Sequence, residues 1–152
     1  MMKYSSLVIL LLLPIGSVVA GANAGALSVI PKPQSLERLP GSFTLNNETQ
    51  IVVTGNAAEF QPVAGLLAEK LRRATGFEAN IQKSSGSNTL SNAILFTSST
   101  NQSLGNEGYS LTVTEHAVTI AANAGAGAFY ALQTFFQLLP VAIECDSIAR
   151  PP

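Results

Sequence analysis

The chain has 152 residues, of which 47% are hydrophobic and 11% charged, and its formal net charge at pH 7 is −1. This weakly acidic balance, without a basic cluster, argues against nucleic acid and against an anionic membrane surface as partners. The single cysteine, Cys145, cannot form an internal disulfide and is interpreted as an incidental thiol.

The beginning of the chain predicts a secretory signal peptide. Lys3 precedes the apolar run Leu7–Leu13, and small residues around Ala24 and Ala26 offer a cleavage site of the A-x-A type. The apolar run is shorter than the roughly 20 residues of a membrane span, and Pro14 interrupts it. Cleavage would leave no membrane span. We therefore expect an exported protein, periplasmic or extracellular, or secretory or lysosomal in a eukaryote.

The mature part is expected to begin with extended segments. The two prolines of Ile30–Gln34 favour extended backbone. Pro40–Leu45 is typical of a turn entering a short strand. The β-branched run in Thr49–Gly55 predicts a further strand, bounded by turn-forming residues.

A first amphipathic helix is expected to follow. Asn56 and Glu59 match an Asn variant of the capping box, and Gly76 suits the position just after the last turn. Pro62 is tolerated only in a first turn or at a kink, so we expect the regular helix to begin near Phe60. Its apolar residues recur at helical spacing: Phe60, Val63, Leu66, Leu67 and Leu71.

Short strands are predicted next. Phe77–Gln82 alternates apolar and polar residues, and Ala93–Thr97 is a short apolar run typical of a buried strand. Two further alternating runs are separated by a break at Glu115-His116, which predicts a hairpin. The apolar residues of that hairpin are Tyr109, Leu111, Val113, Val118 and Ile120.

A second helix is predicted from Gly127 to Pro140, which stops it. Its expected core face consists of Ala128, Phe129, Leu132, Phe135, Phe136 and Leu139. Phe135, Phe136 and Leu138–Leu139 give this helix more apolar surface than one sheet needs. A helix that is apolar on more than one stripe indicates a second packing partner.

These elements predict an α+β fold, with a mixed or antiparallel β-sheet covered by two α-helices and preceded by a signal peptide. Residues 1–26 are assigned to the signal peptide and 27–140 to one domain. Residues 141–152 lack periodicity and end on two prolines, so they are interpreted as a truncated linker.

Few residues of the chain can do chemistry. The one histidine, His116, is expected at the exposed hairpin tip, and the one aspartate, Asp146, lies in the irregular tail. The glutamates are scattered and are interpreted as solvated: Glu37, Glu48, Glu59, Glu69, Glu78, Glu107, Glu115 and Glu144. The sequence therefore predicts no catalytic residue and no metal ligand.

Gly125-Ala126-Gly127 is a partial dinucleotide-binding fingerprint. It follows a strand and opens a helix, but the third glycine position is Tyr130, and the preceding strand is expected in a hairpin. Small residues here would also let the helix start close against the sheet. We therefore predict no cofactor-binding residue and no cofactor.

Several ordered motifs resemble the N-terminal accessory domain of family 20 glycoside hydrolases, the β-N-acetylhexosaminidases (chitobiase-like). The resemblance covers about residues 30–140. Its motifs are Ile30-Pro31-Lys32-Pro33-Gln34, Gly41-x-Phe43-x-Leu45, Leu67-x-x-Lys70-Leu71-x-x-Ala74-Thr75-Gly76, Gly108-Tyr109-x-Leu111-x-Val113, Val118-x-Ile120-x-Ala122 and Gly127-Ala128-Phe129-Tyr130-x-Leu132-Gln133-Thr134-x-x-Gln137-Leu138-Leu139.

The resemblance implies a domain that packs against a catalytic (β/α)₈ barrel and carries no catalytic residue itself. In the family, an adjacent Asp-Glu pair on the barrel serves a substrate-assisted hydrolysis. This chain has no Asp-Glu dipeptide, and a barrel needs about 250 residues. No family catalytic residue can therefore be carried over to a position here.

Two functions follow as hypotheses. The first is the accessory domain of an exported β-N-acetylhexosaminidase, an enzyme that removes terminal N-acetylhexosamine from glycans. This chain would be inactive alone, and its partner would be a barrel normally on the same chain. The alternative is a free-standing exported carbohydrate-binding or partner-docking module. The absence of Trp and the core-like spacing of most Phe residues favour the first.

Overall fold

The computed structural model describes residues 29–38, 41–84 and 91–144. The predicted signal peptide lies outside these residues, and so do Cys145 and Asp146. Among the described residues, no helix is long and apolar enough to cross a membrane.

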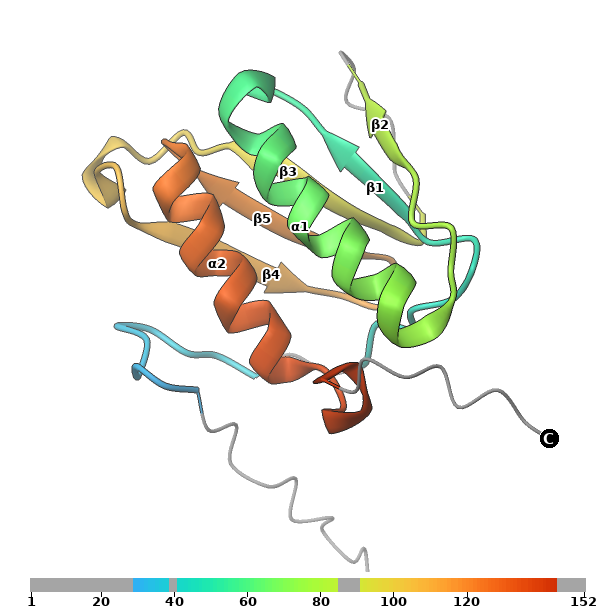
Figure 1. Ribbon diagram of the computed structural model, residues 1–152. Coiled ribbons are helices and arrows are strands. Elements are labelled where there is room, and N and C mark those ends of the chain that lie inside the picture. The colour runs from blue at the N-terminus through green and yellow to red at the C-terminus, as the bar shows by residue number, and fades with distance from the viewer. Residues whose placement is uncertain (1–28, 39–40, 85–90, 145–152) are drawn as a thin grey trace, which may run out of the picture.

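One mixed sheet and two helices form two layers (Figure 1). The strands are β1 (Gln50–Val53), β2 (Ile81–Lys83), β3 (Ala93–Ser98), β4 (Tyr109–Val113) and β5 (Ala117–Ala122). The helices are α1 (Ala57–Thr75) and α2 (Gly125–Leu138), and two short 3₁₀ turns are η1 (Gln102–Leu104) and η2 (Val141–Glu144). Both α-helices cover the same face of the sheet.

The strand order is β2-β1-β3-β5-β4. Neighbouring strands are parallel except at the β4–β5 hairpin. The predicted α+β class with a mixed sheet and two helices is therefore confirmed. A wholly antiparallel sheet is wrong, because α1 carries the chain from β1 back to a parallel β2.

Alternation along the strands determines the core. Ile51 and Val53 of β1 face the helices, while Val52 between them points to the opposite face. The buried core on the helix side also includes, from the other strands and the helices, Ile94, Phe96, Val118, Ile120, Phe60, Leu67, Leu71, Ala131, Leu132 and Phe135. Each of these side chains is at most 3% exposed.

The first helix begins earlier than predicted, at Ala57 rather than near Phe60. It runs through Pro62, which is exposed. Its end is as predicted: Gly76 adopts φ 75° and donates its N–H to the Arg72 carbonyl.

Two predicted strands are wrong in part. No strand forms over residues 41–45, although Phe43 and Leu45 do pack against the core. Over 77–82, only the last two residues belong to β2. The Arg72 guanidinium binds the carbonyls of Glu78 and Ala79 at 2.9 and 3.1 Å, and Ala79 has a φ of 44°, so the backbone turns there.

The predicted hairpin is confirmed. Val113 and Val118 pair in register, and a three-residue link joins the strands. The Thr114 hydroxyl accepts hydrogen bonds from the His116 and Ala117 N–H groups and closes the turn. His116 lies in this link and is exposed, as predicted.

Candidate functional site

The described residues do not assemble a catalytic or metal centre. His116 lies at the hairpin tip, away from any second histidine, and the glutamates are spread over turns and helix surfaces. Within residues 29–38, 41–84 and 91–144, no three His, Cys, Asp or Glu side chains lie close enough to hold a metal ion. The search for a functional site therefore turns to the motif residues and the surfaces.

The glycines at the start of α2 serve close packing. A side chain on Gly127 would overlap the Gly108 carbonyl oxygen and would come within 3.2 Å of the Ala122 side chain. The Gly127 N–H donates to the Asn106 carbonyl at 3.0 Å. The Gly125 N–H donates to the Glu59 carboxylate at 2.6 Å. Both glycine donors at this helix start are engaged by the protein, which argues against a phosphate site.

Glu59 therefore joins the two helices rather than completing a capping box on its own. The Asn56 side chain does not cap α1; its amide donates to Glu59 Oε1 at 2.8 Å. Glu59 Oε2 accepts from Gly125 at the start of α2. These two hydrogen bonds, the one from Gly125 first, lower the pKa of Glu59 below its usual 4.5.

Two other motif residues hold the framework. The Tyr109 hydroxyl lies 2.5 Å from the Thr134 hydroxyl, which fixes β4 to α2. The Gln137 side chain accepts from the Ile30 N–H and donates to the Ile30 carbonyl, each at 2.9 Å. The motif residues thus stabilise the fold.

The helices α1 and α2 run parallel and in register. Glu59 meets Gly125 near their first turns, and Lys70 Nζ lies 5.3 Å from the Phe136 ring centroid near their last turns. Both pairs are separated by the same 66 positions in the sequence, so the two helices keep step over about three turns. Their outward sides therefore form one continuous surface, which we call the helix face.

The helix face exposes large apolar side chains. Leu66 on α1 is 47% exposed, Phe129 and Tyr130 on α2 are 39% and 46% exposed, and Val141 of η2 is 83% exposed. The prediction that Phe129 belongs to the core face is therefore wrong, because the buried stripe of α2 runs through Ala128, Ala131, Leu132 and Phe135. The predicted excess of apolar surface is present, but different residues carry most of it.

The opposite face of the sheet differs. Its strand residues alternate with the core residues, and they are Gln50, Val52, Gln82, Ala93, Leu95, Thr97, Ser110, Thr112, Ala117, Thr119 and Ala121. None carries a charge. Val52 is buried and Leu95 is half-buried, and neither is among the exposed large apolar residues of the described chain.

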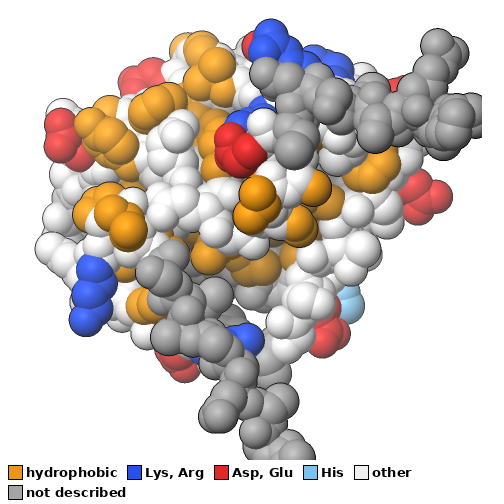
Figure 2. Space-filling model, turned by 60° about the horizontal axis from the view of Figure 1, so that its bottom comes forward, with side chains coloured by type: hydrophobic (Ala, Val, Ile, Leu, Met, Phe, Trp, Pro, Cys, Tyr) orange, Lys and Arg blue, Asp and Glu red, His pale blue; other side chains and the backbone are white. Residues whose placement is uncertain are grey.

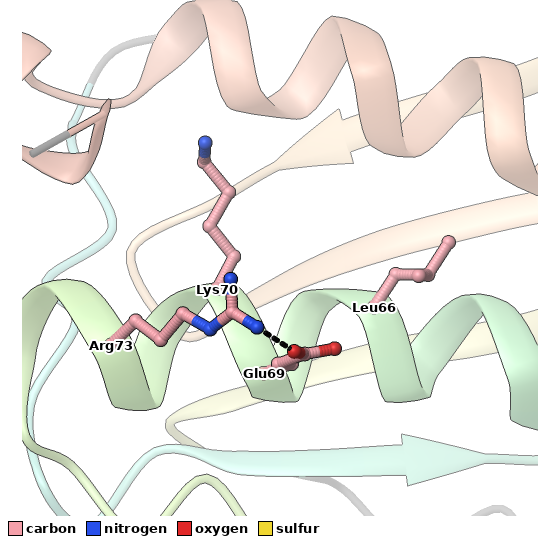
Figure 3. A pocket seen from close by; sticks show the side chains of 4 residues that line it. All are labelled: Leu66, Glu69, Lys70 and Arg73. Carbon is pink, nitrogen blue, oxygen red and sulfur yellow. Dashed lines mark hydrogen bonds and ion pairs between the residues drawn. The ribbon is translucent and has the colours of Figure 1, made fainter. Parts of the chain in front are cut away.

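Two hollows lie on the helix face, and both are lined by Lys70. The smaller hollow, about 170 Å³, is bounded by Leu66, Glu69 and Arg73 along α1. Figure 3 shows Lys70 reaching from α1 toward α2, while Arg73 pairs with Glu69 along α1. The larger hollow measures about 470 Å³ and lies where α1, α2 and η2 meet.

The fold is a small two-layer α+β domain whose two helices bury one face of the sheet and expose large apolar side chains. The family model "Glycosyl hydrolase family 20, domain 2" matches residues 26–149. The chain therefore belongs to this family, as its motifs predict.

Individual relatives agree. The chain is 36% identical, over 121 residues, to a β-hexosaminidase of Porphyromonas gingivalis. The match covers 80% of this chain and 15% of that protein. The family 20 β-N-acetylhexosaminidase of Streptomyces coelicolor A3(2) matches at 36% identity with a TM-score of 0.70, over 78% of this chain and 23% of that chain. A mutant Streptomyces plicatus β-hexosaminidase, solved with its product GlcNAc, matches at 34% identity and a TM-score of 0.65. This match covers 78% of this chain and 22% of that chain. The chain thus spans less than a quarter of these relatives.

Several residues of the helix face were not identified from the sequence. Leu66 was noted only as an apolar residue beside the helical stripe, and its neighbour Leu67 is the buried residue. Lys70 was noted as a position of a family motif, and residues 141–144 were interpreted as the start of a linker. The one available signal was the surplus of apolar residues near the end of α2.

Proposed function

We propose that this chain is the accessory domain of a β-N-acetylhexosaminidase and that its helix face packs against the catalytic barrel. The observation that carries the proposal is the exposure of Leu66 on α1 and of Phe129 and Tyr130 on α2, the two helices that cover one face of the sheet. A soluble two-layer domain normally turns polar helix surfaces toward water. Exposed apolar patches of this kind mark interaction surfaces.

The relatives support the identity of the partner. Both the curated and the solved relatives are named as hexosaminidases, and each extends far beyond the part that this chain matches. The remaining three quarters or more of each relative offers a body large enough for a barrel of about 250 residues. In this proposal the barrel holds the catalytic residues and the glycan, and the accessory domain supports it from outside.

Export is part of the proposal. The support for it is the pattern of the first 26 residues, with an early lysine, an apolar run and small residues at the expected cleavage site. Expression with and without these residues, followed by fractionation and N-terminal sequencing of the product, tests it. A product that keeps all 26 residues and stays in the cytoplasm would contradict export.

The alternative is a carbohydrate-binding module, and one observation favours it. Phe129 and Tyr130 are adjacent, exposed aromatic residues on α2. Their rings meet at 64° with centroids 6.0 Å apart, so they do not form one flat platform for a sugar ring. Binding of the purified chain to a glycan array would favour this alternative over the first proposal.

The test of the main proposal uses two proteins. The first is this chain alone, assayed on a chromogenic N-acetylglucosaminide, where we expect no turnover. The second is a chimera in which residues 29–144 replace the matching region of the Porphyromonas gingivalis enzyme. An active chimera supports the proposal. Turnover by the chain alone, or a chimera that folds but is inactive, would overturn it.

A further inference from the structure

The segment that leaves the domain is fastened to the helix face. η2 follows α2 directly, and its Ile143 is only 8% exposed, within the core cluster. Glu144 Oε2 lies 2.7 Å from Lys70 Nζ. Residues 141–144 were expected to begin a linker, but the structure packs them against α1.

The segment that enters the domain is fastened at the same end. Ile30 is held on both sides of its peptide by Gln137, near the end of α2, and Val29 beside it is 7% exposed. Gln137 and Lys70 both line the larger hollow. The chain therefore enters and leaves the domain at the end where both helices finish (Figure 1).

The larger hollow has the composition of a seat for an apolar group. Five of its nine lining residues are apolar, Phe136, Leu139, Pro140, Val141 and Ile143, and Gln133 and Gln137 add uncharged polar groups. Figure 2 shows apolar side chains gathered in the middle of this end of the molecule. The two charges that line it, on Lys70 and Glu144, pair with each other. The smaller hollow, by contrast, has one apolar and three charged residues in its lining.

We propose that the larger hollow is the seat for an apolar side chain of the catalytic domain, and that Lys70 fixes η2 as a wall of this seat. This inference rests on the proposed function, because that function supplies the domain that follows η2. Three observations select this occupant: the chain leaves the domain at the hollow, the hollow continues the exposed helix face, and its charges are internally balanced. Lys70 acts here as a positioning residue.

The seat is tested in the chimera described above. Val141→Asp places a charge at the rim without disturbing the core, since Val141 is 83% exposed. We expect it to lower the activity that survives heating by about tenfold or more, because the docked apolar side chain would bury an unpaired charge beside it. Thr112→Asp, on the exposed opposite face of the sheet, is the matched control and should leave the chimera unchanged.

The role of Lys70 is tested in the chain itself. Lys70→Met keeps the apolar stem over Phe136 and removes the charge that binds Glu144. Amide hydrogen exchange at residues 141–144 should accelerate about two- to fivefold, as expected for loss of a partly exposed ion pair. Arg73→Met, which breaks the neighbouring pair with Glu69, should leave this exchange unchanged.

The outcomes separate the two proposals. If Val141→Asp behaves like Thr112→Asp while Tyr130→Asp inactivates the chimera, the seat is wrong and the docking helix face stands. If neither Val141→Asp nor Tyr130→Asp has an effect, docking by the helix face is wrong as well. Unchanged exchange in Lys70→Met would overturn the assignment of Lys70.

Discussion

The two outer faces of this domain reverse the usual distribution of polarity. The sheet has one face without covering helices, yet that face consists of Thr, Ser, Gln, Ala and two shielded aliphatic residues. The helices should provide the soluble face, yet they expose Leu66, Phe129 and Tyr130. The difference indicates which layer contacts another domain. The open sheet face suits water, and the helix face suits a second domain.

The largest change in stability is expected when a buried residue of α2 is truncated rather than an exposed one. Leu132 is fully buried, and Leu132→Ala should lower the free energy of unfolding by about 2–5 kcal/mol through the cavity it leaves. Phe129→Ala, one turn away on the outer side, should cost about 1 kcal/mol or less in the chain alone. Urea denaturation of both variants measures the difference. Equal losses would show that Phe129 belongs to the core.

Gly127 tests how tightly α2 sits on the sheet. Gly127→Ala introduces a Cβ that overlaps the Gly108 carbonyl, so the helix start must shift. We expect a loss of about 1–3 kcal/mol, the usual cost of overpacking. Gly65→Ala on α1, where a Cβ would meet nothing within 4 Å, is the control and should be neutral or stabilising. An equal change in the free energy of unfolding of the two variants would contradict the close packing of α2 against the sheet.

The third prediction tests the difference between the two faces directly. Tyr130→Asp and Thr112→Asp each place a charge on an exposed position, one on the helix face and one on the sheet face. Neither should change the stability of the chain alone by more than about 0.5 kcal/mol. In the chimera, Tyr130→Asp should reduce the heat-resistant activity about tenfold or more, and Thr112→Asp should not. The reverse order would assign the docking surface to the sheet.

The smallest effect concerns Glu59, where the two helices begin. Its lowered pKa means that the ionised carboxylate stabilises the fold above pH 4.5, and that this contribution is lost as the pH falls through the lower folded value. Glu59→Gln should therefore lower the melting temperature at pH 7, and the difference from the wild type should shrink as the pH falls from 4.5 and vanish below the lowered folded pKa. Glu69→Gln is the control on the same helix. A difference between Glu59→Gln and wild type that does not shrink in acid would contradict this role.

Much of the fold could be predicted because local patterns and burial agree. The apolar run of β3, the alternation in β5, the helical spacing around Leu67 and the glycine at position 76 all place the residues as the structure does. Phe43 and Leu45 show the limit of such patterns. A short strand was predicted there, but a strand also requires a neighbouring backbone to pair with, and sequence alone does not supply one.

The helix face was less accessible to sequence reasoning. A helical stripe can be drawn through Phe129 or through Ala128, and only packing against the sheet decides between them. The Glu59–Gly125 and Lys70–Glu144 contacts join residues more than sixty positions apart, so no local rule could find them. The surplus of apolar residues was readable, but its location was a tertiary property.

The parallel register of α1 and α2 also gives the domain an electrical direction. Each helix carries roughly half a positive charge at its start and half a negative charge at its end, and in parallel neighbours these add. The negatively charged Glu59 lies at the positive ends of the two helices, and the positively charged Lys70 lies near their negative ends. The side-chain charges at the two ends therefore oppose the added dipoles, and the parallel pairing of the helices is tolerated because each end carries a compensating charge.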